Sequence, residues 1–284
     1  MRFAVTALLW LATTVALGVA VPAAWAQVHV VDERGFAALA HKAAADPRLQ
    51  SAMADELATR TIALIAARGG GRYRVDGPRV HAAAAAFTAG PAFPPLFAQA
   101  NRAAHAWAFT DPRFGRAGTA WAVDVSPMLR DGALAQLLAD YRVTVPADLT
   151  VALTQAGPPL RQGQLSRLST WGPWLSIGAA ALAVVCALLT LAAARRRGKA
   201  LTSLGVSALL VGAAGWAGTE VAGRRVDGAL RRGGGDIRRV AEAMVAYAEA
   251  GVRLWLDVTL LAGVALVVLG VLVAMAGSLV RKGG

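Results

Sequence analysis

A helix-spaced polar set near the middle of the chain is the most distinctive candidate for chemistry. Asn101 and His105 are four residues apart, so on a helix they share one face, with Arg102 beside them. Such a face could bind an anion, or could place His105 as a proton donor near Asp124 or Asp111. The same set could instead form a hydrogen-bond network that fixes its helix to a strand bearing Asp124. No residue is assigned as catalytic, and His105 and Asp124 are the candidates carried forward.

A second candidate binding surface consists of three arginine pairs, seven residues apart, in the segment 220–253. Residues seven apart lie close to one face of a helix, so the pairs could form a basic stripe that contacts anionic headgroups or envelope polymers. Three glycines at 233–235 interrupt this pattern, and five acidic residues in the same segment allow a solvated surface of balanced charge instead. The pairs are Arg224 and Arg225, Arg231 and Arg232, and Arg238 and Arg239.

The sequence predicts neither a metal site nor a cofactor. The four histidines, His29, His41, His81 and His105, do not have the spacing of two ligands on one helix turn. Cys186 is the single cysteine and lies within an apolar run, which excludes an intrachain disulfide. The sequence has no phosphate-binding loop, no dinucleotide-binding glycine pattern and no nucleophile elbow.

The elements that position these residues follow from an apolar composition. Of 284 residues, 56% are hydrophobic and 16% are charged, against roughly 25% charged residues in a soluble domain. The mean hydropathy is +0.50. Four uncharged runs each have about the 20 residues that a membrane-spanning helix needs. They cover residues 3–21, 174–194, 200–219 and 258–280.

The basic residues that flank these runs predict the orientation of the chain. Arg2, the cluster at 195–199 and the pair at 281–282 contain no acidic residue, which places them on the cytoplasmic face. Much of the net charge of +12 is therefore an orientation signal, and we expect no nucleic-acid partner. We expect a multi-pass protein of the plasma membrane with both termini in the cytoplasm. Its parts are a signal anchor over 1–26, an extracytoplasmic domain over 27–170, membrane helices over 171–194, 200–219 and 254–280, a cytoplasmic loop over 195–199, an Arg-rich extracytoplasmic loop over 220–253 and a cytoplasmic tail over 281–284.

The first apolar run permits two interpretations. Ala24 and Ala26 follow it with the spacing of a signal-peptidase site, which would release the helix. The run is also long enough to remain as a membrane anchor. Both interpretations place residue 27 and those after it outside the cytoplasm.

The large polar segment is expected to fold as an α+β, mostly helical domain. Helical patterns cover 32–45, 47–68, 80–87, 96–109 and 130–141, and the second begins with Asp46 as N-cap and Pro47 at the first position. Residues 119–125 and 149–153 alternate in polarity like strands and could pair. The predicted fold class is therefore a four-span α-helical membrane protein with an extracytoplasmic α+β domain.

Small residues align on the third and fourth membrane helices. Such positions let helix backbones approach closely, within one chain or between protomers, although a chain rich in Gly and Ala also produces some of these spacings by chance. We expect the lipid bilayer as one partner, and a membrane protein or a second copy of the chain as another. The packing candidates are Gly205, Ala208, Gly212, Gly263, Gly270, Ala274 and Gly277.

Several short motifs, in their order along the chain, resemble those of an uncharacterised family of actinobacterial integral membrane proteins. They are Ala24-Trp25-Ala26, Val31-Asp32-Glu33-Arg34-Gly35-Phe36, Ala44-Ala45-Asp46-Pro47, Gln99-Ala100-Asn101-Arg102-Ala103-Ala104-His105 and Val123-Asp124-Val125-Ser126-Pro127-Met128. The resemblance implies four membrane spans, a retained first helix and an extracytoplasmic domain between the first two spans. It implies no activity.

Three functions agree with these patterns. The first is a non-enzymatic envelope protein whose outer domain binds a protein, a lipid or a wall component. The second is an accessory subunit of a transport or envelope-assembly complex; the runs themselves contain no ionisable residue, which argues against a transporter acting alone. The third is an envelope hydrolase or transferase that uses His105 and a nearby carboxylate.

Overall fold

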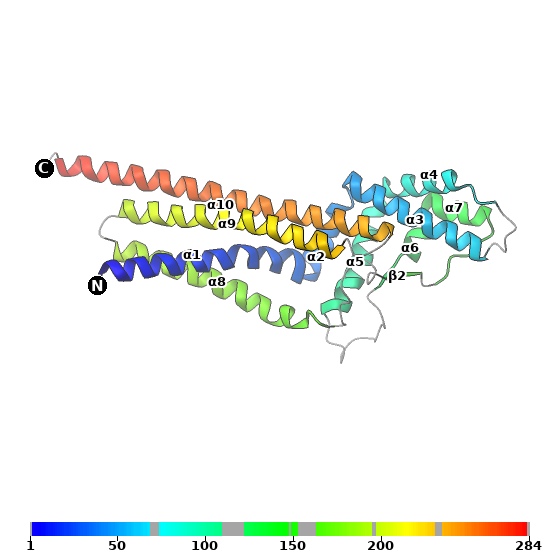
Figure 1. The fold of residues 1–284 in the computed structure, drawn as a ribbon, viewed down its shortest axis with the longest axis horizontal. Helices are drawn as coiled ribbons and strands as arrows, with labels where there is room; N and C mark the ends of the chain where they lie inside the picture. The colour runs from blue at the N-terminus through cyan, green and yellow to red at the C-terminus, as the bar shows by residue number, and fades with distance from the viewer. Residues whose placement is uncertain are drawn as a thin grey trace. The chain divides into compact units, whose positions relative to one another are not determined.

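The apolar runs form the four longest helices of the protein: α1 (Arg2–Ala26), α8 (Ser166–Ala193), α9 (Arg197–Leu230) and α10 (Asp236–Lys282) (Figure 1). All four are long and apolar enough to cross a membrane. This confirms the prediction of a mostly helical chain with four helices that could span a membrane. The computed structural model describes residues 2–68, 74–109, 122–147, 149–152, 163–194, 197–230 and 235–282.

The chain divides into two units. We call residues 1–28, 170–224 and 249–284 the span unit, and residues 29–169 and 225–248 the helical domain. Helix α10 contributes to both, because its first 13 residues, 236–248, belong to the helical domain. The Arg-rich segment 220–253 was expected as a loop, but its described residues lie within α9 and α10 apart from Gly235.

Polar side chains join α1 to α9 within the span unit. The indole Nε1 of Trp10 donates a hydrogen bond to the carbonyl oxygen of Ser203 at 3.0 Å. One helical turn further, the hydroxyl of Thr14 donates to the hydroxyl of Ser207 at 2.8 Å. Ala16 and Ala20 of α1 are buried in the same unit. Helix α1 is therefore a packed member of this unit and continues into a π-helical turn, η1 (Gln27–Val31).

The helical domain is formed mainly by six helices whose ends follow local sequence signals. Asp32 and Asp76 cap two of them by accepting hydrogen bonds from backbone amides three residues ahead. Asp46 accepts one from the backbone N of Arg48, as the Asp-Pro signal predicted. The helices are α2 (Glu33–Ala43), α3 (Pro47–Arg68), α4 (Gly77–Thr88), α5 (Phe93–Phe109), α6 (Ser126–Leu129) and α7 (Gly132–Asp140).

The expected strand pairing is confirmed, but it is small. Strand β1 (Ala122–Asp124) pairs antiparallel with β2 (Thr150–Ala152), with Val123 opposite Val151. With three residues in each strand, this ribbon forms no layer against which helices could pack. The α+β prediction therefore requires correction, and the described part of the domain is a helical unit with one short ribbon.

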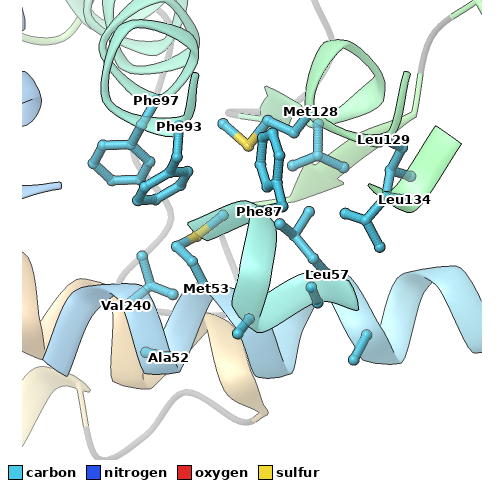
Figure 2. Packing of buried hydrophobic residues seen from close by; sticks show 14 of the residues in the cluster. Ala52, Met53, Leu57, Phe87, Phe93, Phe97, Met128, Leu129, Leu134 and Val240 are labelled. Atoms are coloured by element: carbon cyan, nitrogen blue, oxygen red, sulfur yellow. The ribbon is translucent and has the colours of Figure 1, made fainter. Parts of the chain in front are cut away.

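The core of the domain lies where α3, α4, α5, α6 and α7 meet. Figure 2 shows Phe87 and Phe93 together with Met128, next to Met53 and Leu57 of α3. The Phe93 ring lies edge-on to Phe87, with 6.0 Å between ring centroids. Leu57, Phe93 and Met128 are almost completely buried. Burying a side chain of this size contributes about 1.5–3 kcal/mol, so this aromatic cluster is a main source of domain stability.

Candidate functional site

The helical domain contains an apolar cavity of about 310 Å³. This volume lies at the lower end of the roughly 300–1,000 Å³ that is typical of small-molecule sites. Most of its lining consists of aliphatic, aromatic and thioether side chains from several helices and from β1. They are Val30, Phe36, Leu39, Met53, Phe97, Val123, Val125, Met128, Ile237, Val240, Ala241, Met244, Val245 and Ala248, joined by His29, Glu56 and Asn101.

Helix α10 supplies one wall of this cavity because its first turns are amphipathic. Ile237, Val240, Ala241 and Met244 recur at three- and four-residue intervals, the period of a buried helical face. Ile237 and Val240 are buried, and the other two pack against the same core. Residues 236–248 therefore complete the helical domain instead of forming a solvated loop.

A polar cluster anchors this part of α10 to α3. Arg239 Nη1 lies 2.6 Å from Asp55 Oδ2, and Arg239 Nη2 also pairs with Asp236. The hydroxyl of Thr59 donates to Asp236 Oδ2 at 2.8 Å. We call Asp55, Thr59, Asp236 and Arg239 the α3–α10 clasp. It fixes the wall of the cavity by ion pairs outside the apolar lining.

One buried carboxylate faces the apolar lining. Glu56 is only 3% exposed, and its Oε1 accepts a hydrogen bond from Arg60 Nε at 2.8 Å, one helical turn further along α3. Asn101 is a second polar lining residue, and its Nδ2 donates to the carbonyl oxygen of Phe97 at 2.9 Å. Arg60 compensates the charge of Glu56 from outside the lining. The cavity thus combines a large apolar area with a small number of fixed polar groups, as ligand sites do.

The structure separates the three members of the Asn101, Arg102 and His105 set. Asn101 lines the cavity, whereas Arg102 Nε lies 3.5 Å from Glu33 Oε1 on α2. His105 is buried, and its Nε2 donates to the carbonyl oxygen of Val30 at 2.9 Å. These contacts fix α5 to η1 and α2. One interpretation of the sequence expected them to fix α5 to the strand that bears Asp124.

The catalytic candidates are engaged in structural contacts. The ring of His105 stacks on Phe109 with 4.2 Å between centroids, and His105 does not line the cavity. Oδ1 of Asp124 accepts hydrogen bonds from the backbone N and hydroxyl of Ser126 and from the backbone N of Leu149. Asp111 lies outside the described residues. Among the residues that the structure describes, no group of three His, Cys, Asp or Glu could hold a metal ion.

The arginine pairs do not meet as one stripe within the described residues. Arg224 lies on α9, 3.7 Å from Glu220, and Arg225 follows it on the same helix. Arg238 lies 3.4 Å from Glu242, and Arg239 belongs to the α3–α10 clasp. Arg231 and Arg232 lie outside the described residues. Acidic side chains thus pair with Arg224, Arg238 and Arg239.

Small residues meet where α9 and α10 cross in the span unit. A Cβ added to Gly205 would lie 2.7 Å from the carbonyl oxygen of Gly263, and one added to Gly263 would lie 3.0 Å from that of Gly205. A Cβ on Gly270 would lie 2.7 Å from the carbonyl oxygen of Gly198. The two backbones therefore touch, and the glycine face is used within the chain.

The remaining packing candidates have different surroundings. A Cβ on Gly212 would meet the side chain of Leu260, and one on Gly198 would lie 2.7 Å from the backbone N of Ala274. Ala208 is buried on α9. Gly277 lies in α10, and its surroundings are outside the description.

Sequence reasoning missed Glu56 and the α10 wall of the cavity. Glu56 interrupts the apolar stripe of α3 between Met53 and Leu57, with Arg60 four residues later as a partner. A buried acid with a nearby arginine was thus visible as a pattern. The buried face of α10 could have been predicted from the helical spacing of Ile237, Val240 and Met244. The charged residues between them favoured a surface position instead.

The fold defines this chain as a multi-pass membrane protein in contact with the lipid bilayer, since four of its helices can cross a membrane. Comparison with protein-family models, with curated proteins and with solved structures finds no match.

Proposed function

We propose that this chain is a non-enzymatic membrane protein of the cell envelope whose helical domain binds a lipid-like apolar molecule. The observation that carries the proposal is the cavity of about 310 Å³ with its largely apolar lining. Hydrophobic ligands gain roughly 25 cal/mol for each Å² of apolar surface that leaves water. The contacts of His105 and Asp124 favour this function over hydrolysis, because both side chains already hold the fold together.

The orientation of the chain is part of the proposal. Basic residues at Arg2, at 195–199 and at 281–282 favour a cytoplasmic position for both termini. The helical domain would then lie on the extracytoplasmic side, as the resemblance to the actinobacterial family also implies. Its cavity would receive a molecule from the outer leaflet or from the cell envelope.

Labelling with a photoreactive 12-carbon alcohol tests the proposed function. The full chain, in nanodiscs of phosphatidylcholine, is irradiated with the diazirine-bearing alcohol, and the labelled peptides are mapped by mass spectrometry. We expect labels on Val240 and Met244, which line the cavity. Replacing Ala248 with Phe fills space in the cavity and should reduce this labelling at least about tenfold.

The matched control uses the same substitution two residues away on α10. Ala246 is exposed and does not line the cavity, so Ala246→Phe should label like the natural chain. Thermal unfolding of both variants checks that they are folded. Equal labelling of the two variants, or labels restricted to lipid-facing residues of the spans, would contradict cavity binding.

The packing of α1 predicts that the first helix is retained. Ala24 and Ala26 lie within α1, and Trp10 and Thr14 bond to α9. Removing α1 would take away the Thr14 hydroxyl that donates to Ser207, a residue that is completely buried. The intact mass of a C-terminally tagged protein, purified from membranes, should therefore include residues 1–26. A purified chain that starts at Gln27 would show that signal peptidase removes the helix.

A further inference from the structure

We infer that the cavity selects a chain-like apolar ligand with a hydrogen-bond donor at one end, an alcohol or an amine, and discriminates against fatty-acid anions. The inference rests on the proposed function and adds the ligand class. It follows from which atoms of Glu56 and Asn101, two of the three polar lining residues, are already engaged and which are left.

On Glu56 and Asn101, the polar atoms that no described residue engages are acceptors. Glu56 Oε1 accepts from Arg60, and no described residue donates to Oε2. The Nδ2 of Asn101 donates to the carbonyl oxygen of Phe97, which leaves its Oδ1 as an acceptor. The orientation of the Asn101 amide follows from this bond, because a carbonyl oxygen can only accept.

The two arginines close to Glu56 and Asn101 do not line the cavity. Arg60 and Arg102 are absent from the lining, and they pair with Glu56 and Glu33. His29 is half-buried and lines the cavity, but an imidazole can donate or accept and so does not select one ligand class. The fixed acceptors among the lining residues are therefore the Glu56 carboxylate and the Asn101 amide oxygen.

The acceptors of Glu56 and Asn101 favour a donor group on the ligand. A hydroxyl or an ammonium can donate to Glu56 Oε2 or Asn101 Oδ1, and an ammonium adds charge attraction. A fatty-acid carboxylate has only acceptor oxygens, so it could not donate to either group unless it bound in its neutral form. Carboxylic acids are mostly ionised in water at pH 7, so the neutral form is the minor one.

A series of three probes with one chain tests the inference. Diazirine-bearing 12-carbon amine, alcohol and carboxylic acid are compared on the full chain in phosphatidylcholine nanodiscs at pH 7. We expect the amine and the alcohol to label Val240 and Met244 at least about tenfold more than the acid. The acid labelling cavity residues as well as the alcohol would overturn the inference and leave the proposed function intact, whereas no cavity labelling by any of the three would overturn both.

Two charge-neutralising variants test the role of Glu56. Glu56→Gln has nearly the same shape and should raise the labelling by the acid, relative to the alcohol, at least about tenfold. Glu242→Gln removes an acid from the outer side of α10 that does not line the cavity, and it should leave the ratio unchanged. An unchanged ratio in Glu56→Gln would show that Glu56 is not the selecting group. The three probes on the natural chain decide the ligand class even if Glu56→Gln does not fold.

Discussion

Replacing Gly205 with Ala is expected to destabilise the span unit by about 2–3 kcal/mol, because a methyl group here has no space. Its Cβ would lie 2.7 Å from the carbonyl oxygen of Gly263 and 2.8 Å from the backbone N of Val267. Backbone atoms cannot rotate away as a side chain can, so α9 and α10 must separate. Thermal unfolding of the purified full chain should show a melting temperature lower by about 5–10 °C.

The control is Gly218→Ala on the same helix, where a Cβ would meet nothing within 4 Å. Alanine favours a helix over glycine by up to about 1 kcal/mol, so this variant should be neutral or more stable. The two substitutions are chemically identical, but only Gly205→Ala should lower the melting temperature. Equal melting temperatures would show that the close approach of α9 and α10 contributes little to stability.

This contact illustrates what the sequence alone can predict. Gly263 and Gly270 are seven residues apart, and Gly205 and Gly212 have the same spacing, so each pair lies near one face of a helix. The spacing identified the faces and left open whether they meet within one chain or between two. Only the three-dimensional structure determines that Gly205 meets Gly263.

Local signals also predicted most of the helices in the helical domain. Asp46 and Pro47 marked the start of α3, whose observed range is the predicted one. Helix α5 begins at Phe93, three residues before its predicted start, because prolines are tolerated in the first turn of a helix. Short-range rules thus located these elements to within a few residues.

The cavity and the α3–α10 clasp could not be predicted in the same way. Thr59 and Asp236 are 177 residues apart in the sequence, and their hydrogen bond depends on the folded chain. Charged residues at 236, 238, 239 and 242 made the start of α10 resemble a solvated surface, although its apolar residues also have a helical period. His105 was correctly placed on a helix, but its bond to Val30 follows from tertiary packing.

The clasp supports a prediction about the wall of the cavity. Asp55 is 21% exposed and lies 2.6 Å from Arg239 through Oδ2 and 2.7 Å from His81 Nε2 through Oδ1. Asp55→Ala removes both contacts and should cost about 2 kcal/mol, because hydrogen bonds to charged groups in a partly buried site contribute more than exposed pairs. Hydrogen exchange of the amides at 236–248 should accelerate at least about tenfold, while exchange at 258–276 stays unchanged.

The ion pair between Arg79 and Asp140 provides the matched control. Its two side chains are 59% and 56% exposed, although its distance of 2.8 Å resembles that of the clasp. Exposed pairs contribute at most about 1 kcal/mol, so Asp140→Ala should leave exchange at 236–248 unchanged. If Asp55→Ala behaved like Asp140→Ala, apolar packing by Ile237 and Val240 alone would hold α10 in place. A selective acceleration in Asp55→Ala, together with weaker labelling of Val240 by the alcohol probe, would show that the clasp maintains the cavity.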